Sequence, residues 1–373
     1  MVVLNKYGSF FCVGILAGMI SLTSNAFLGA ETAGKTAPAQ AWGSAAGEIA
    51  KAVARRKGKT ELSKLALSMK PGTWAELKTE KPKGLWSAPQ PSKGLHIGTW
   101  SDDAHWDSRT GQFLFFGVRQ TRKFVAYSEE SNAWRVIEFH EKENAPGLVQ
   151  RYGHHYSNNS LDPVRSHFYT TSWRYDIVND SWSKLPSPFR SMTYEYFTAM
   201  DALVSLERER GNLAYLGHAE KNWKRIKKIS VHGYHSLARY NPWREEILFA
   251  GGNDIRTVVA LRKDGTVAQM NDFPLPVSKF TICMDIMTVD PISGRYLIMS
   301  RRDGNQLVEF DSQKNEYRLI DDFTKTPWPF RKSTPMVAYI PEYGVTMWAD
   351  KKVHLYKHNP SADLKVLEYQ ETQ

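Results

Sequence analysis

Asn179-Asp180-Ser181-Trp182-Ser183-Lys184-Leu185 is a polar turn followed by an aromatic residue, two variable residues and an apolar residue. This order is typical of a short strand entered from a tight turn. The same order recurs in segments that begin at Trp74, Trp134, Trp182, Trp223, Val267 and Tyr317. Their spacing of roughly 40–60 residues is close to the repeat length of propeller blades, each of which holds several short strands.

A second repeat alternates with the first and leads through a turn into an apolar strand. Pro presets several of these turns, and Gly provides positive φ at the end of others. The copies begin at Asp107, Asp162, Glu207, Asn241, Asp290 and Ile340. The last copy has no Trp-x-x-Leu segment after it in the compact part of the chain. We therefore expect the strand at Trp74 to complete the last blade, which removes the open edges of the ring.

The predicted fold is all-β, a single propeller of six four-stranded blades in residues 73–373, with seven blades as the alternative. We expect the blades to begin near residues 98, 153, 196, 233, 280 and 333. The third blade is expected to be short, because the chain reaches Trp223 soon after Leu216-Gly217. Residues 364–367 are a second candidate for the strand that closes the last blade.

The N-terminal region has a different composition. Residues 1–26 contain one charge, Lys6, and an apolar run before Ser24-Asn25-Ala26, which is the pattern of a secretory signal peptide. A membrane anchor is the alternative, although the run is short for a bilayer span. Residues 27–72 are predicted to form a linker and short basic helices. We therefore expect a secreted or periplasmic protein with no integral membrane domain after signal cleavage.

Composition excludes several classes of protein. The chain has 49 Lys and Arg against 39 Asp and Glu, and this net charge of +10 favours an anionic partner. Cys12 would leave with the signal peptide, so Cys283 would remain alone, without an intramolecular disulfide or a Cys-rich zinc site. No nucleotide-binding, α/β-hydrolase or zincin motif is present. We noticed no concentrated basic stripe and expect no nucleic-acid partner.

The clearest repeat resembles a kelch unit of the galactose-oxidase type. Residues 174–186, Arg-Tyr-Asp-Ile-Val-Asn-Asp-Ser-Trp-Ser-Lys-Leu-Pro, carry the Tyr-Asp, turn, Trp and Leu-Pro order of that family, and Gly251-Gly252 matches its paired glycines. The other blades have one glycine or none at that place. The resemblance covers roughly residues 74–358 and implies the architecture better than an activity. It gives no support for a copper oxidase, and no cofactor is identified.

Polar residues at the starts of the predicted inner strands are candidates for a site at the mouth of the central channel. His, Tyr and Arg together could remove the C5 proton of a uronic acid, protonate the leaving oxygen and neutralise the carboxylate. The candidate catalytic residues are His155, His235, Tyr156 and Arg239. The candidate substrate-binding residues are His105, Trp106, His154, Tyr196, Tyr234, Lys279 and Lys332.

Two other interpretations of these residues stay open. The histidines from separate blades could bind a metal ion, although strand alternation directs only some of them inward. They could instead hydrogen-bond neighbouring inner strands and fill the channel. The function predicted first is binding of an acidic polysaccharide at the channel mouth, with cleavage by β-elimination as a further step. The alternative is a non-catalytic kelch-type scaffold that binds a protein or glycan in the cell envelope.

Overall fold

The structure is a computed structural model of the 373-residue chain. It describes residues 37–87, 96–98, 103–117, 123–137, 157–170, 172–186, 191–207, 210–231, 235–252, 255–274, 285–300, 305–323 and 335–368. The predicted signal peptide and Cys283 lie outside the described residues.

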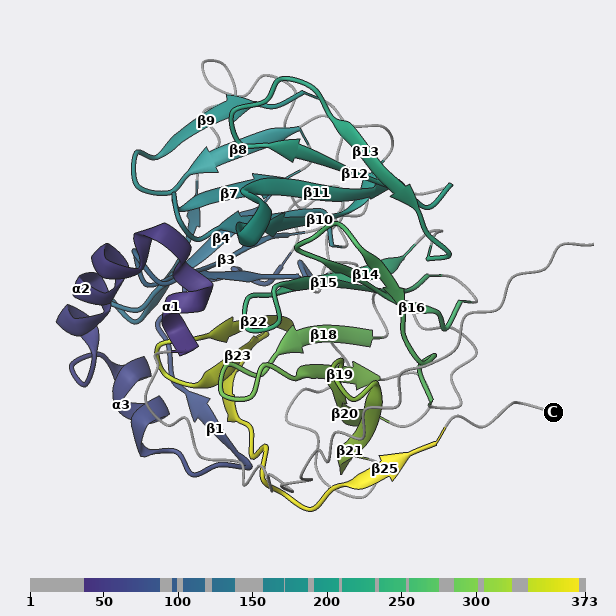
Figure 1. The fold of residues 1–373 in the computed structure, drawn as a ribbon. Helices are drawn as coiled ribbons and strands as arrows, with labels where there is room; N and C mark the ends of the chain where they lie inside the picture. The colour runs from purple at the N-terminus through teal and green to yellow at the C-terminus, as the bar shows by residue number, and fades with distance from the viewer. Residues whose placement is uncertain are drawn as a thin grey trace, which may run out of the picture. The chain divides into compact units, whose positions relative to one another are not determined.

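Six antiparallel sheets form the blades of a propeller (Figure 1). From the inside outward the strands follow sequence order in every blade except the last, whose outermost strand is the N-terminal one. The first three blades are β2 (His105–Asp107), β3 (Gln112–Phe116), β4 (Phe124–Ser128) and β5 (Ala133–Ile137); β6 (Asn159–Asp162), β7 (His167–Thr170), β8 (Trp173–Asp176) and β9 (Ser181–Lys184); and β10 (Ser191–Phe197), β11 (Ala202–Glu207), β12 (Asn212–Gly217) and β13 (Lys224–Lys228).

The other three blades complete the ring. They are β14 (Ser236–Asn241), β15 (Glu246–Gly251), β16 (Val258–Arg262) and β17 (Val267–Gln269); β18 (Asp285–Val289), β19 (Tyr296–Ser300), β20 (Gln306–Asp311), β21 (Glu316–Asp322) and β25 (Lys365–Leu367); and β22 (Met336–Ile340), β23 (Val345–Ala349), β24 (Val353–Lys357) and β1 (Thr73–Leu77). Each inner strand contacts the inner strands of the two neighbouring blades, and β2 contacts β22. The prediction of six blades in a closed ring is confirmed.

The N-terminal strand closes the last blade, as the repeat pattern predicted. β1 pairs antiparallel with β24, and Trp74 lies opposite Tyr356. The Trp74 ring stacks on the Tyr356 ring at a centroid distance of 4.6 Å and meets the Trp348 ring edge-on at 5.4 Å. Aromatic pairs of this kind add about 0.5–1.5 kcal/mol beyond the burial of their surface. The repeated aromatic residue therefore fixes the outer strand to its own blade.

Two details of the predicted strand order were wrong. The third blade has all four strands, because its inner strand begins at Ser191 and residues 207–211 connect its second and third strands. Its first turn runs through a 3-10 helix, Thr198–Met200, to Asp201, whose φ is 48°, so it lacks the Asp-Pro or Gly pattern of the other turns. Residues 364–367 do not close the last blade, because β25 pairs with β21 in blade 5.

The second repeat is explained by side chains that cap the turn after the inner strand. Asp107 accepts hydrogen bonds from the backbone N–H groups of Arg109 and Thr110, and Asp162 and Asn241 make the equivalent bonds two and three residues on. Asp and Asn side chains that bond to the nearby backbone favour a turn over regular structure, and they therefore mark the end of the inner strand. Two of them also join blades: Ser166 donates to Asp107, and the Asn241 amide donates to the Gly294 carbonyl.

Three short helices precede the ring and pack against it, grouped together on one side in Figure 1. They are α1 (Ala37–Trp42), α2 (Ala46–Arg56) and α3 (Glu61–Ser68), with a 3-10 turn at Gly43–Ala45. Gly58, with a φ of 74°, separates α2 from α3, and the Thr60 hydroxyl caps α3 by accepting a hydrogen bond from the Ser63 N–H. None of the helices that the structure describes is both long and apolar enough to cross a membrane.

Arg56 fixes the helices to blades 1 and 6. Its guanidinium contacts the Glu129 carboxylate at 2.8 Å and the Glu342 carboxylate at 3.7 Å, and donates to the carbonyl of Ser108. Leu62 and Ala66 of α3 are buried in the same apolar core as the strands of those two blades. The helices are therefore part of the folded domain, and they cover the ends of the turns that follow the inner strands.

Candidate functional site

The described part of the central channel is nearly filled at the end that α1 covers. Inner-strand residues from several blades line a cavity there, and Trp42 of α1 lies in its wall. The cavity has a volume of about 30 Å³. Because one water needs about 10–15 Å³ of such space, the cavity has room for about two or three waters and is too small for a sugar ring.

Arg239 occupies the channel and bonds to residues of three other blades. Its guanidinium donates to the Asp103 carboxylate, to the Ala104 carbonyl at 3.3 Å and to the Met287 carbonyl at 3.2 Å. Glu195 of β10 lies 4.0 Å away. Arg239 is buried, and Asp103 and Glu195 compensate its charge within the protein. This arrangement matches the interpretation in which inner-strand polar groups hydrogen-bond neighbouring blades.

Burial strongly perturbs Glu195, one of the two carboxyl groups around Arg239. Loss of solvent raises the pKa of Glu195 well above its usual range, and the nearby Arg239 charge only partly opposes this shift. His105 Nε2 lies 3.4 Å from the second oxygen of Asp103. The described channel thus contains one arginine, two carboxyl groups and one imidazole. Arg239 is placed to hold the blades together rather than to neutralise the carboxylate of a ligand.

Four of the predicted site residues, His105, Trp106, Tyr196 and Arg239, line this one small cavity. Trp106 donates its indole N–H to Glu342 at 2.8 Å, and the Tyr196 hydroxyl donates to Asp201 at 2.5 Å. His235 immediately precedes β14 and has a φ of 78°, an uncommon value for a residue other than glycine. The remaining candidates lie outside the described residues: His154, His155, Tyr156, Tyr234, Lys279 and Lys332.

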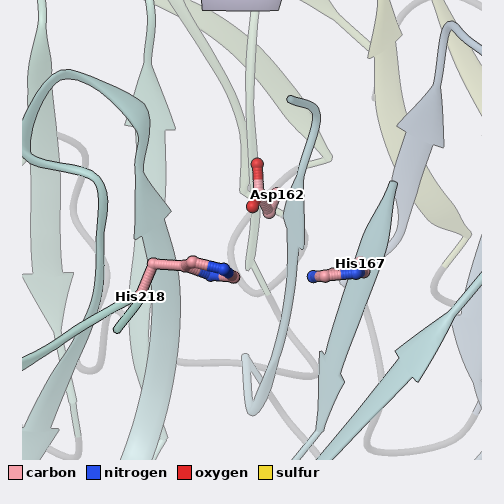
Figure 2. Close-up of side chains that lie close together, drawn as sticks. All are labelled: Asp162, His167 and His218. Carbon is pink, nitrogen blue, oxygen red and sulfur yellow. The ribbon is translucent and has the colours of Figure 1, made fainter. Parts of the chain in front are cut away.

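A cluster that the sequence analysis did not single out lies between blades 2 and 3. Asp162 at the end of β6, His167 at the start of β7 and His218 after β12 each offer a ligand atom, and these atoms lie within 4.8 Å of one another. Figure 2 shows the two imidazole rings pointing toward one another, with the Asp162 carboxylate beside the gap. The ring centroids are 6.0 Å apart. This combination of side chains can bind a metal ion.

Charged groups surround this cluster. The Asp162 carboxylate receives the Arg165 guanidinium at 2.8 Å, and Arg165 also contacts Asp201. Burial lowers the pKa of His167 and of His218, and the charges of nearby arginines lower each further. The Nδ1 atoms of both histidines are buried and have no hydrogen-bond partner. Neutral imidazole is the form that binds metals.

Only two of the three residues of this cluster, Asp162 and His167, lie close together in the sequence. Asp162 stands in the repeated turn, and His167 follows it within the same hairpin. His218 lies in another blade, and no local spacing connects it with the other two residues. Within blade 3 the His218 N–H donates to the carbonyl of Asp201, and the Asp201 carboxylate contacts Arg165 of blade 2, so contacts between the two blades bring His218 near. The two histidines of this cluster lie far apart in the sequence, so no motif with a fixed histidine spacing detects them.

A basic strand forms the outer edge of blade 3, and the sequence analysis did not single it out either. β13 has the sequence Lys-Arg-Ile-Lys-Lys, and its four cationic side chains are exposed. Lys224 pairs with Glu220 at 2.5 Å. Among the described residues, Arg225, Lys227 and Lys228 form no ion pair. With Lys221, which is also exposed, β13 therefore presents a concentrated positive charge, named here the β13 basic strand.

Comparisons with known proteins agree on the fold. No family model and no curated protein matches the chain. A solved protein of unknown function from Bacteroides thetaiotaomicron is 11% identical, with a TM-score of 0.52 over 76% of this chain and 75% of that one. An auxiliary nutrient binding protein from Bacteroides ovatus is 8% identical, with a TM-score of 0.54 over 79% and 76%. These similarities support a six-bladed β-propeller, and they do not confirm the kelch-type assignment.

Proposed function

We propose that this chain is an exported, kelch-like propeller that binds an acidic polysaccharide without cleaving it. The observation that carries the proposal is the β13 basic strand, where exposed cations follow one another along the outer edge of blade 3. The net charge of +10 favours an anionic partner in the same way. The resemblance in fold to a protein named as nutrient binding is consistent with a binding role.

The spacing of the cations suits a polymer better than a small anion. Residues in a strand rise about 3.3 Å each, so β13 spreads its four charges over more than 10 Å. A polyuronate carries one carboxylate per sugar and can contact several of these cations at once. Each exposed ion pair contributes only about 0–1 kcal/mol, so binding depends on several contacts and weakens as salt screens them.

Arg239 supports binding over cleavage in this proposal. β-Elimination needs a cation that neutralises the uronate carboxylate, so that the C5 proton becomes acidic enough to be removed. Arg239, the predicted catalytic cation, is enclosed and compensated by Asp103 and Glu195. It therefore does not fill this role from its position in the structure.

A second candidate function, cleavage by elimination, is favoured by one observation. His235 is held at a φ of 78° directly before the inner strand of blade 4, and uncommon backbone conformations gather at functional sites. In this mechanism an imidazole takes the C5 proton while a tyrosine protonates the leaving oxygen. His155 or His235 would supply the base and Tyr156 the acid.

The experiment that separates the two functions measures binding and cleavage on the same samples. The purified chain is titrated with a polyuronate, a neutral glucan and duplex DNA, and ultraviolet absorbance is followed for the C4–C5 double bond that elimination creates. Binding of the polyuronate alone, with no absorbance change, is the expected result. Absorbance that grows with time and disappears in His235→Ala would establish the lyase instead. Equal or tighter binding of DNA would contradict the glycan proposal.

Export is part of the proposal and has its own test. Residues 1–26 are proposed to be removed as a signal peptide. The intact mass of the protein recovered from outside the cytoplasm should match a chain that begins at Phe27, directly after Ser24-Asn25-Ala26. A full-length chain recovered only from the cytoplasm would contradict export, whatever the result of the glycan titration.

A further inference from the structure

We propose that Asp162, His167 and His218 bind a first-row divalent transition metal ion such as Zn²⁺, in a site that connects blades 2 and 3. The proposal starts from the geometry. The three ligand atoms lie within 4.8 Å of one another, and they come from two different blades. Donors around a tetrahedral zinc ion, with bonds of about 2.0–2.2 Å, lie about 3.4 Å apart. The ligand atoms therefore need to approach one another by about 1.4 Å at most.

The unpaired ring nitrogens are the second observation. Buried polar atoms are nearly always hydrogen-bonded, and leaving one without a partner costs about 1–3 kcal/mol. The Nδ1 atoms of His167 and His218 are both buried without a partner. The two rings also face one another across the gap, in an arrangement that no hydrogen bond between them explains (Figure 2). A metal ion would satisfy nitrogen atoms of both rings at once.

The groups behind the ligands support this assignment. His167 Nε2 lies 3.6 Å from the Asp176 carboxylate, so a metal on Nδ1 would leave Nε2–H directed toward a carboxylate. Metal-bound histidines usually donate their second N–H in this way, which fixes the tautomer and the ring orientation. Blade 2 therefore already provides the carboxylate of Asp176 and the imidazole of His167, two of the three members of a carboxylate–imidazole–metal arrangement.

The positive charge of Arg165 would repel a metal ion, but two carboxylates already compensate this charge. Arg165 contacts Asp162 and Asp201, at 2.8 and 2.7 Å. Asp176 and Arg174 also act on the two histidines, so the neighbourhood holds three carboxylates and two guanidinium groups. Each oxygen of Asp162 has two acceptor positions, so the carboxylate can keep its bond to Arg165 and still bind a metal. Three protein ligands leave a fourth position for water, as in open zinc sites.

The test uses tag-free, full-length protein that has been stripped with a chelator. Zn²⁺ is added, unbound metal is removed, and the zinc content per chain is measured together with the dissociation constant. We expect one zinc ion per chain in the wild type, and an affinity at least tenfold lower in both His167→Ala and His218→Ala. His354→Ala, which removes a buried imidazole from blade 6, should bind zinc like the wild type.

A cobalt experiment identifies the ligands directly and does not depend on a loss of binding. Co²⁺ bound to His218→Cys should produce a thiolate-to-cobalt charge-transfer band that the wild type lacks. The proposal is overturned if the wild type retains no zinc, if both histidine variants bind zinc as tightly as the wild type, or if His218→Cys retains Co²⁺ without the new band. These results are independent of whether the chain binds a glycan.

Discussion

Arg239 and Asp103 form a buried ion pair in the channel, although Arg239 belongs to blade 4 and Asp103 precedes the first strand of blade 1. With Met287 of blade 5 and Glu195 of blade 3, this one side chain connects four of the six blades. Between the described inner segments of neighbouring blades, strand pairing is limited to isolated bridges, Asp103 with Val337 and Ser157 with Thr193. The guanidinium therefore adds directional bonds to blades that pair only sparsely at the centre.

Replacing Arg239 should strongly destabilise the fold. Arg239→Met leaves Asp103 and Glu195 buried without their cation, and breaking a buried pair in this way costs about 3–5 kcal/mol. The free energy of unfolding in urea measures the loss. The double variant Arg239→Met with Asp103→Asn should recover part of it, because one uncompensated charge is removed. Arg135→Met, a change at an exposed arginine, should cost less than about 0.5 kcal/mol.

Stability should depend on pH through Glu342, which lies between α2 and blades 1 and 6. Burial raises the pKa of Glu342 to about 7, while hydrogen bonds from Trp106 and Ser108 oppose the shift. The folded chain then holds a proton that the unfolded chain has lost between pH 4.5 and about 7. The stabilising contribution is present at the acidic end of this window and is lost as pH rises through it.

The Glu342→Gln variant isolates this effect. Its free energy of unfolding, relative to the wild type, should change by about 3 kcal/mol across that window, because one pKa unit corresponds to about 1.4 kcal/mol. Urea unfolding at a series of pH values provides the measurement. Glu61→Gln, at an exposed glutamate of α3, should follow the wild type at every pH. Parallel curves for Glu342→Gln and the wild type would refute the assignment.

Cysteines placed across the closing strand should form a disulfide. Thr73 of β1 lies opposite Lys357 of β24, and paired residues in antiparallel strands have Cα atoms about 4.5–5.5 Å apart, within the range that a disulfide spans. In a Cys283→Ser background, Thr73→Cys with Lys357→Cys should crosslink in the folded monomer and raise its midpoint of thermal unfolding. Thr73→Cys with Val178→Cys, on blade 2, should remain reduced within the monomer.

The architecture was largely predictable from sequence because its two repeats are local. Trp-x-x-Leu segments mark outer strands whose aromatic residue packs on its own blade, as Trp74 does on Tyr356. The Asp and Asn turns are marked by side chains that bond to their own backbone, as Asp107 does. Both signals fit within a few residues. Their alternation was enough to predict six blades and the closing strand.

The predictions from sequence were wrong or incomplete where the structure departs from the local patterns or depends on residues far apart in the chain. The first turn of blade 3 uses Asp201 in a left-handed conformation in place of Gly, so its inner strand was placed too late. β25 has three residues, too few for a pattern that could choose between two neighbouring sheets. His218 joins Asp162 and His167 only through the register of two blades. The compensation of Arg239 by Asp103 likewise depends on contacts across the channel.

The β13 basic strand gives the most direct test of the proposed function. The affinity of the chain for a polyuronate is measured at increasing salt concentration, for the wild type and for a variant with Arg225→Gln, Lys227→Gln and Lys228→Gln. A control variant removes three exposed cations from α2 and the turn after it instead, at Lys51, Lys57 and Lys59. We expect the β13 variant to bind at least tenfold more weakly and with less dependence on salt, and the control to match the wild type. Equal losses in the two variants, or no loss in either, would contradict the proposal.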